Sequence, residues 1–296
     1  MLINLQSLYL RIVAFPLALI LYVGGWKRRV LRENVQRCGI RRPFFRLSFC
    51  THVALDFVRL AHGWYGQAIR LRPQDTEKLK KLKSNPAVYL TAHFHHWELM
   101  GAWMTAQGIR LLSAARPMSH PYAQRLLMRM RSRLGLATVS ERIPRKALLH
   151  LEQGGCFGML WDQRVPSSPI RAAFFGQPLG VDPLPLFFLR HRSVAVWFGA
   201  ILPDGTLRLL LLAAPSSSLS QSLAPTRLAR RYHRVLEVLI RKHPTWWYGM
   251  AHRRFLESPP FHSLVGVSRE TSTASGVMVS RETKVSTELE NQSSLP

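Results

Sequence analysis

Five short, almost purely apolar runs along the middle of the chain constrain the fold more than any other feature. They are Ala87–Thr91, Ile109–Ser113, Cys156–Trp161, Val194–Ile201 and Leu207–Leu212. Most are too continuously apolar to leave one face in water, so they predict strands of a sheet that is covered on both sides. Helical patterns lie between and around them, at Pro43–Trp64, Asp75–Lys83, Trp97–Gln107, Pro121–Leu134, Arg145–Glu152 and Leu219–Lys242. This alternation predicts an α/β fold: a single layered domain with a largely buried central sheet flanked by helices.

The N-terminus is a second apolar region. Residues 1–26 carry one charge, Arg11, and the basic cluster Lys27-Arg28-Arg29 follows directly. This length and composition predict an N-terminal membrane helix that spans the bilayer or lies in its interface. The alternative is a signal peptide, but the stretch lacks a basic start and an obvious small-residue cleavage site. By the positive-inside rule, the basic cluster places the following domain in the cytoplasm.

The rest of the chain divides into a body and a tail. Residues 27–257 have the size of one catalytic domain and show no obvious internal linker. Residues 258–296 are rich in Ser and Thr and keep no helical or strand period, so they predict a disordered tail. The three cysteines are odd in number and far apart, which indicates neither a disulfide framework nor a thiolate metal site.

The chain is strongly basic. Lys and Arg total 41 against 16 Asp and Glu, a formal net charge of +25. Such a surplus indicates a polyanionic partner: nucleic acid, an anionic membrane surface, a phosphorylated substrate or an acidic carrier protein. Zinc-finger and RNP-type motifs are lacking, which disfavours nucleic acid, although a plain basic groove would leave no signature.

The stretch TAHFHHWELMG, residues 91–101, places three histidines and an acid just after a predicted strand. It matches neither the HxHxDH array of binuclear hydrolases nor the HExxH helix, so no metal site is predicted. His93 falls at a strand's C-terminal end, where open α/β sheets usually carry their chemistry. Glu98, in the first turn of the next helix, is predicted to accept the Nδ1 proton of His93 and leave Nε2 as a general base. In the alternative interpretation, Glu98 only complements the helix N-terminus.

Two further residues bear on this choice. In the helix predicted at Pro121–Leu134, Arg131 falls on the apolar face. A buried guanidinium keeps its proton and must meet an acid or a substrate anion, unless it reaches the surface. Asp162 follows another predicted strand, so Glu98 and Asp162 are the expected internal partners of buried positive charge.

Together these segments resemble the lauroyl/myristoyl acyltransferases of lipid A biosynthesis. The resemblance runs from about Trp26 to Phe255 and rests on HFHHWELMG, ARPMSHPYAQRLLMRMRSRLG, GGCFGMLWDQR, AAFFGQPLG, LEVLIRKHP and AHRRF, in that order. It implies a glycerolipid-acyltransferase-like fold and transfer of an acyl chain from acyl carrier protein to a hydroxyl of a lipid A precursor. The expected location is the cytoplasmic face of the inner membrane. The resemblance implies no cofactor and no nucleic-acid partner.

The resemblance also implies site residues. His93 and Glu98 match the catalytic pair, and Arg131 and Asp162 match supporting positions of the active site. The expected substrate-binding residues are Arg116, Gln163, Phe174 and Phe175. The two phenylalanines could line an acyl channel or pack in the core.

The chain departs from the family pattern beside the expected base. Where the family commonly has HFGNWE, this chain has HFHHWE, so His95 and His96 replace a small and an amide residue. If protonated, they could lower the basicity of His93. Three alternatives stay open: an acyltransferase acting on another glycolipid or a lysophospholipid, a basic nucleic-acid-binding protein, and a non-catalytic membrane protein.

Overall fold

The structure is a computed structural model that describes residues 5–61, 69–115, 117, 120–140, 142–215, 225–252 and 255. The helices are α1 Leu5–Val23, α2 Arg28–Arg37, α3 Phe45–Ala61, α4 Pro73–Ser84, α5 Trp97–Ala106, α6 Pro121–Arg133, α7 Ile143–Glu152, α8 Leu184–His191 and α9 Pro225–Lys242. The strands are β1 Arg70–Leu71, β2 Ala87–Thr91, β3 Leu111–Ala114, β4 Ala137–Val139, β5 Cys156–Leu160, β6 Arg171–Phe174, β7 Gln177–Gly180, β8 Ala195–Ile201 and β9 Thr206–Ala213. Two 3₁₀ turns follow α9: η1 Pro244–Trp246 and η2 Tyr248–Ala251.

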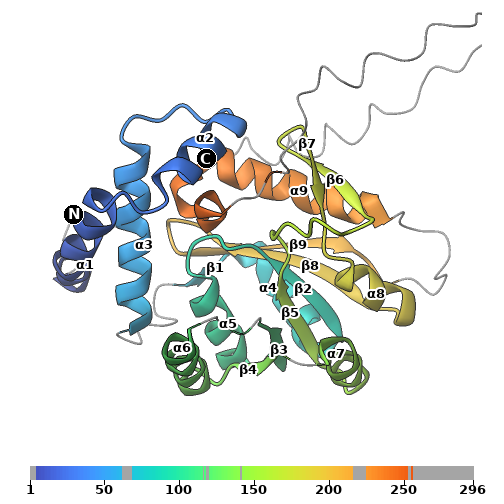
Figure 1. Ribbon diagram of the computed structural model, residues 1–296. Coiled ribbons are helices and arrows are strands. Elements are labelled where there is room, and N and C mark those ends of the chain that lie inside the picture. Colours follow the sequence, from blue (N-terminus) through green and yellow to red (C-terminus); the bar gives the residue numbers. More distant parts are fainter. Residues whose placement is uncertain are drawn as a thin grey trace, which may run out of the picture. The chain divides into compact units, whose positions relative to one another are not determined.

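A seven-stranded sheet forms the centre, in the order β1-β9-β8-β2-β5-β3-β4. Each neighbouring pair is parallel except β8 and β9, which are antiparallel. Helices lie on both faces of the sheet, with α9 on one side and α4 and α5 on the other (Figure 1). The predicted α/β architecture, a largely buried central sheet flanked by helices, is therefore confirmed, and the structure adds that the sheet is mostly parallel.

The central strand β2 shows why its sequence is apolar throughout. Val88 and Leu90 belong to one buried cluster, whereas Ala87 and Tyr89 belong to another. Successive side chains of a strand point to opposite faces, so each core takes alternate residues. Because every residue of β2 is buried, the strand cannot alternate polar and apolar positions.

The N-terminal helix α1 packs along α3 (Figure 1). The buried side of α1 consists of Leu10, Ala14 and Ala18, spaced four residues apart, and it meets Ala54 and Val58 of α3. Within the described residues, no single helix is long and apolar enough to cross a membrane. The segments Leu8–Val23 and Arg28–Arg37 meet that criterion together, but they bend by 87°. The predicted spanning helix stays a prediction.

Several elements lack a strong sequence pattern and were not expected. They are the short strands β1 and β4, the β6–β7 hairpin, and the helices α2 and α8. The strands are two to four residues long and lie at sheet edges or in a separate hairpin, where neighbours rather than propensity decide pairing. The predicted tail, residues 258–296, lies outside the described residues.

Candidate active site

The neighbouring strands β2 and β5 bring the central side chains of the site together. They are parallel, with Thr91 opposite Leu160. His93 follows β2 by two residues, and Asp162 follows β5 by two residues. Both side chains therefore emerge at the carboxyl edge of the sheet, as expected for chemistry in an open α/β fold.

Asp162 is the partner of His93. Its Oδ1 lies 2.7 Å from His93 Nδ1, and its Oδ2 accepts the backbone N–H of His93 at 3.1 Å. The Asp162 carboxylate is fully buried, while the His93 side chain is 14% exposed and so remains partly open to solvent. The predicted bond from His93 Nδ1 to Glu98 is thus wrong. The partner is Asp162, which is distant in sequence but follows the adjacent strand.

Glu98 instead holds Arg131. The guanidinium donates from Nε to Glu98 Oε2 at 3.0 Å and from Nη2 to Oε1, a bidentate pair from α6 to the first turn of α5. Both side chains are nearly buried, at 11% and 14% exposed. The expectation that buried Arg131 meets Glu98 or Asp162 is confirmed. Arg125, Arg129 and Arg133 lie on the exposed side of α6.

One hydrogen-bond donor of this ion pair has no partner among the described residues. The Nη1 atom of Arg131 is buried and has no hydrogen-bond partner among the described residues. Leaving a buried charged donor unsatisfied is costly, roughly 1–3 kcal/mol or more. Such a group commonly marks a place where a ligand oxygen or water belongs.

A second side chain that contacts Asp162 comes from the C-terminal part of the chain. Trp247 donates its indole N–H to Asp162 Oδ2 at 2.8 Å. The backbone around it pairs with the loop of His93: Tyr248 N–H donates to His93 O at 2.7 Å, and His95 N–H donates to Trp246 O at 2.9 Å. Trp247 was not predicted, because one tryptophan among eight carries no local signal in the sequence.

The other predicted site residues lie in different surroundings. Gln163 lies beside His93, with its Nε2 3.4 Å from His93 Nε2. Phe174 is a core residue: it is 1% exposed and packs on Trp247 and Phe255, so its predicted contact with substrate gives way to packing. Phe175 is half-buried beneath Arg241, and its contact with substrate stays a prediction. Arg116 lies outside the described residues.

Two cavities flank the first turn of α5. The inner cavity, about 60 Å³, lies between α5 and the sheet; its lining includes Glu98, Arg131, Met100, Met104 and Leu136. The α3–α5 cavity, about 210 Å³, is lined by Val53, Asp56, Phe57, Leu60, His96, Trp97, Glu98, Leu99 and Tyr248. Both reach Trp97 and Glu98, so apolar space adjoins the charged pair on two sides.

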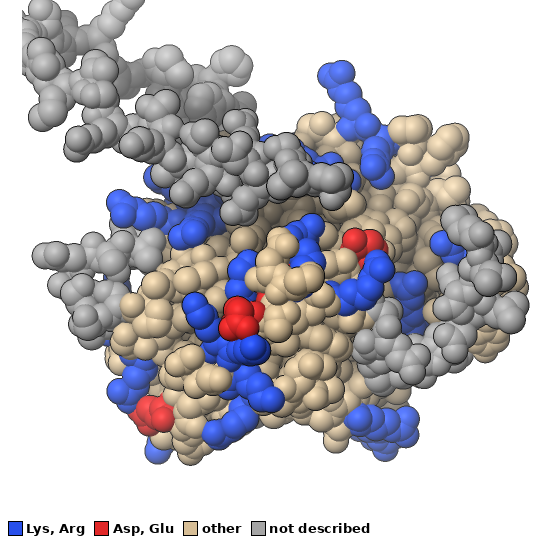
Figure 2. Space-filling model, turned by 180° about the vertical axis from the view of Figure 1, so that it is seen from behind, with Lys and Arg blue, Asp and Glu red and all other residues tan. Residues whose placement is uncertain are grey.

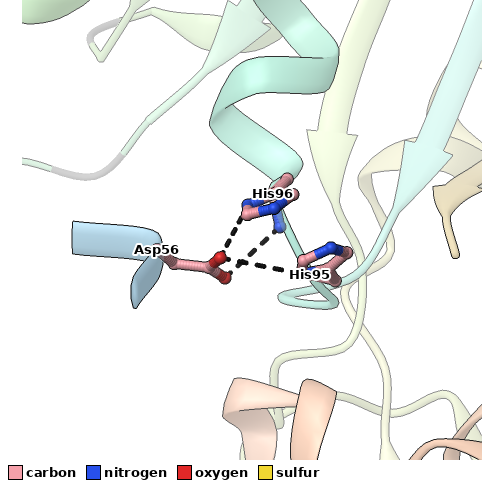
Figure 3. A group of neighbouring side chains, drawn as sticks. All are labelled: Asp56, His95 and His96. Atoms are coloured by element: carbon pink, nitrogen blue, oxygen red, sulfur yellow. Dashed lines mark hydrogen bonds and ion pairs between the residues drawn. The ribbon is translucent and has the colours of Figure 1, made fainter. Parts of the chain in front are cut away.

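His95 and His96 gather around Asp56 of α3 (Figure 3). Burial lowers the pKa of His95 to about 3, despite the opposing effect of Asp56, so this ring is neutral near pH 7. Burial alone would raise the pKa of Asp56, but the adjacent His96 and His95 side chains hold it below its usual range.

One face of the molecule is rich in basic side chains. Figure 2 shows one face on which Lys and Arg side chains are scattered widely while acidic groups are few. This face therefore presents an excess of basic side chains to solvent, which can attract an anionic surface or partner.

Comparison with known proteins adds to this geometry. The family model of the bacterial lipid A biosynthesis acyltransferases matches residues 63–257, which include His93, Glu98, Arg131, Asp162 and Trp247. No curated relative was found for the chain. The match covers about two thirds of the chain and confirms the suspected resemblance. The chain belongs to the bacterial lipid A biosynthesis acyltransferase family.

Proposed function

We propose that the protein moves a fatty acyl chain from the thioester of acyl carrier protein to a hydroxyl of a lipid A precursor, with His93 as general base. The family supplies the reaction class, acyl transfer, and a lipid A-type acceptor. The observation that carries the mechanism is the bond between His93 Nδ1 and the buried carboxylate of Asp162.

This bond supports the proposed positions of the protons. With Nδ1–H donated to Asp162, Nε2 keeps a lone pair and takes the proton of the acceptor hydroxyl as its oxygen attacks the thioester carbonyl. The tetrahedral intermediate then expels the carrier's thiolate, which takes the proton from the imidazolium. The negative Asp162, held by His93 and Trp247, stabilises the transient imidazolium without accepting its proton.

Arg131 is the proposed donor to negative charge in the substrate. Arg131 lines the inner cavity, its Nη1 has no partner among the described residues, and Glu98 holds the guanidinium in place with two bonds. A preorganised charged donor in a poorly hydrated site stabilises a developing oxyanion or an acceptor phosphate more than water does. Glu98 then acts as a positioning residue for Arg131 rather than for His93.

The membrane and the carrier protein are the proposed uses of the remaining surface. Several large apolar side chains of α1 are exposed, among them Ile12, Phe15, Ile20 and Val23, and the basic segment Lys27–Arg29 follows them. An apolar helix face beside exposed cations fits the cytoplasmic leaflet of an anionic inner membrane. The positive surface also fits an acidic carrier protein.

The test is transfer by purified, detergent-solubilised protein. We would incubate it with acyl carrier protein charged with labelled fatty acids and an under-acylated lipid A precursor, and read the product by mass spectrometry. Wild type and His191→Ala, which removes an exposed histidine, should acylate the precursor. His93→Ala should lose most transfer, roughly 10²–10⁴-fold, and keep its fold.

Other outcomes are informative. Retained transfer in His93→Ala would refute the proposed base. Transfer by wild type to a lysophospholipid but not to the lipid A precursor would refute the proposed acceptor and leave the chemistry intact.

A further inference from the structure

The side chains of Asp56, His95 and His96 form a compact donor set outside the proposed acyl-transfer chemistry. Asp56 comes from α3, and the two histidines come from the turn before α5, so the set joins segments about forty residues apart (Figure 3). One nitrogen of each histidine and one carboxylate oxygen all lie within 4.8 Å of one another.

The three converging atoms are His95 Nδ1, His96 Nδ1 and Asp56 Oδ1. His96 Nδ1 lies 2.6 Å and His95 Nδ1 lies 3.6 Å from Asp56 Oδ1. All three atoms are buried, and although His96 Nδ1 and Asp56 Oδ1 are close enough for an ion pair, none of the three makes an aligned hydrogen bond within the described residues. The two histidine side chains are 2% and 8% exposed, so water does not readily replace the missing bonds.

The distances suit a shared cation. Ligand atoms held about 2.0–2.1 Å from a tetrahedral Zn²⁺ lie about 3.3 Å apart, and the two observed distances bracket that value. Two imidazoles and one carboxylate are a donor set that favours Zn²⁺ and similar divalent transition metals over Mg²⁺ or Ca²⁺.

A metal site also needs an open coordination position and a path by which the ion can enter. The α3–α5 cavity supplies both. Asp56, His96 and Tyr248 are among the residues that line this cavity. Tyr248 also donates to Asp56 Oδ2 at 3.3 Å. This bond leaves Oδ1 free to bind a metal and holds the carboxylate in place.

We propose that Asp56, His95 and His96 bind a divalent transition metal of the Zn²⁺ class, with water from the α3–α5 cavity as the fourth ligand. The metal would tie α3 to the start of α5 and so brace the loop that carries His93. This role is structural and independent of acyl transfer. It departs from the sequence-based expectation of no metal site.

Arg59 is the feature that opposes the site. It lies one turn after Asp56, with Nη1 against His96 Nε2 and 4.0 Å from Asp56 Oδ1. When His96 Nδ1 binds the metal, Nε2 carries the proton and repels this guanidinium, which must swing toward solvent; its side chain is 28% exposed. Removing the Arg59 charge should therefore strengthen metal binding.

The test measures binding directly. Tag-free, detergent-solubilised full-length protein is stripped with a chelator, and Co²⁺ is added as a spectroscopic substitute for Zn²⁺. Wild type should bind one equivalent with visible bands of four-coordinate Co²⁺, and Zn²⁺ should displace it. Competition against a chromophoric chelator then gives the Zn²⁺ affinity.

Variants locate the site. Asp56→Asn, His95→Gln and His96→Gln should each weaken Zn²⁺ binding by at least about 100-fold, the upper end of what loss of a supporting residue costs. Arg59→Gln should strengthen it. His52→Gln is the matched control: His52 lies one turn before Asp56 but bonds to the Thr245 carbonyl, so binding should not change.

Either of two results overturns the proposal: no stoichiometric binding by wild type, or unchanged affinity in both histidine variants. The wild-type spectrum decides even if a variant fails to fold. Absence of binding would leave the cluster as an Asp56–His96 ion pair supported by Arg59.

Discussion

His93 and Glu98 lie five residues apart in the chain, yet their side chains have different partners. His93 bonds to Asp162, which follows the neighbouring parallel strand, and Glu98 bonds to Arg131 of α6. The residue types of the site were predictable, because a histidine and an acid at strand ends and an arginine on an apolar helix face all require partners. Their pairing was not, because it depends on which strands are adjacent.

Asp162→Asn tests the revised pairing. An amide can still accept from the Trp247 indole and the His93 backbone, so the fold should persist. It can no longer favour Nδ1–H or stabilise the imidazolium, so the turnover number should fall by roughly 10²–10⁴-fold. Steady-state kinetics should show little change in KM for the acyl donor. Turnover near that of wild type would mean that Asp162 only packs.

A double-mutant cycle tests the Glu98–Arg131 pair. Removing one partner of a nearly buried pair costs about 3–5 kcal/mol, because the other charge is left unpaired. Glu98→Gln should therefore destabilise the protein, and adding Arg131→Gln should recover part of the loss. Denaturant unfolding measures the coupling. Strictly additive losses would show that the two side chains do not interact in solution.

At the scale of elements, α1 is apolar on two sides. One side packs on α3 through Leu10, Ala14 and Ala18, and much of the rest is exposed. A helix that is apolar all round needs a second apolar environment, which the protein itself does not provide within the described residues. The apolar composition of this stretch was evident from the sequence. That one side rests on α3 was not, since small residues such as Ala14 and Ala18 give no strong pattern.

Charging the exposed side of α1 tests its proposed membrane contact. Phe15 and Ile20 are 65% and 67% exposed, so Phe15→Glu with Ile20→Glu should leave packing on α3 intact. Loss of two buried apolar side chains from the bilayer should weaken binding to anionic vesicles by at least about 100-fold. Co-sedimentation with vesicles measures this. Val238→Glu, at a 51% exposed position of α9, is the control, and equal losses in both would refute the assignment.

At the scale of the whole molecule, the sheet and the C-terminal segment close around the same loop. Asp162 receives bonds from the β2 loop and from Trp247, and the backbone of Tyr248 pairs with His93. The site is therefore assembled only when residues about 150 positions apart have met. Global stability and site geometry should change together.

Lowering the pH should reduce the free energy of unfolding, because a buried histidine binds a proton more weakly in the folded than in the unfolded chain. Burial lowers the pKa of His233 on α9 from 6.5 to about 4, so the unfolded chain binds more protons in that range. This contribution to the free energy of unfolding is complete above pH 6.5 and is lost as the pH falls toward 4, by at most about 1.4 kcal/mol per unit.

Thermal unfolding of wild type and His233→Gln across this pH range checks the effect. The variant can keep the bond to the Ala173 carbonyl, so its stability should depend less steeply on pH. Exposed His191→Gln should behave as wild type. Identical slopes for all three proteins would exclude His233 as the cause.

Local pattern was enough for the α/β class, the long elements and the kinds of residue in the site, because burial on both faces of a sheet forces continuous apolar runs and a buried charge demands a partner. Three features came only from the folded chain: Asp162 as the partner of His93, Trp247 beside it, and Asp56 between His95 and His96. Each joins segments from different elements. Strand order and helix docking set such contacts, and no short window of residues records them.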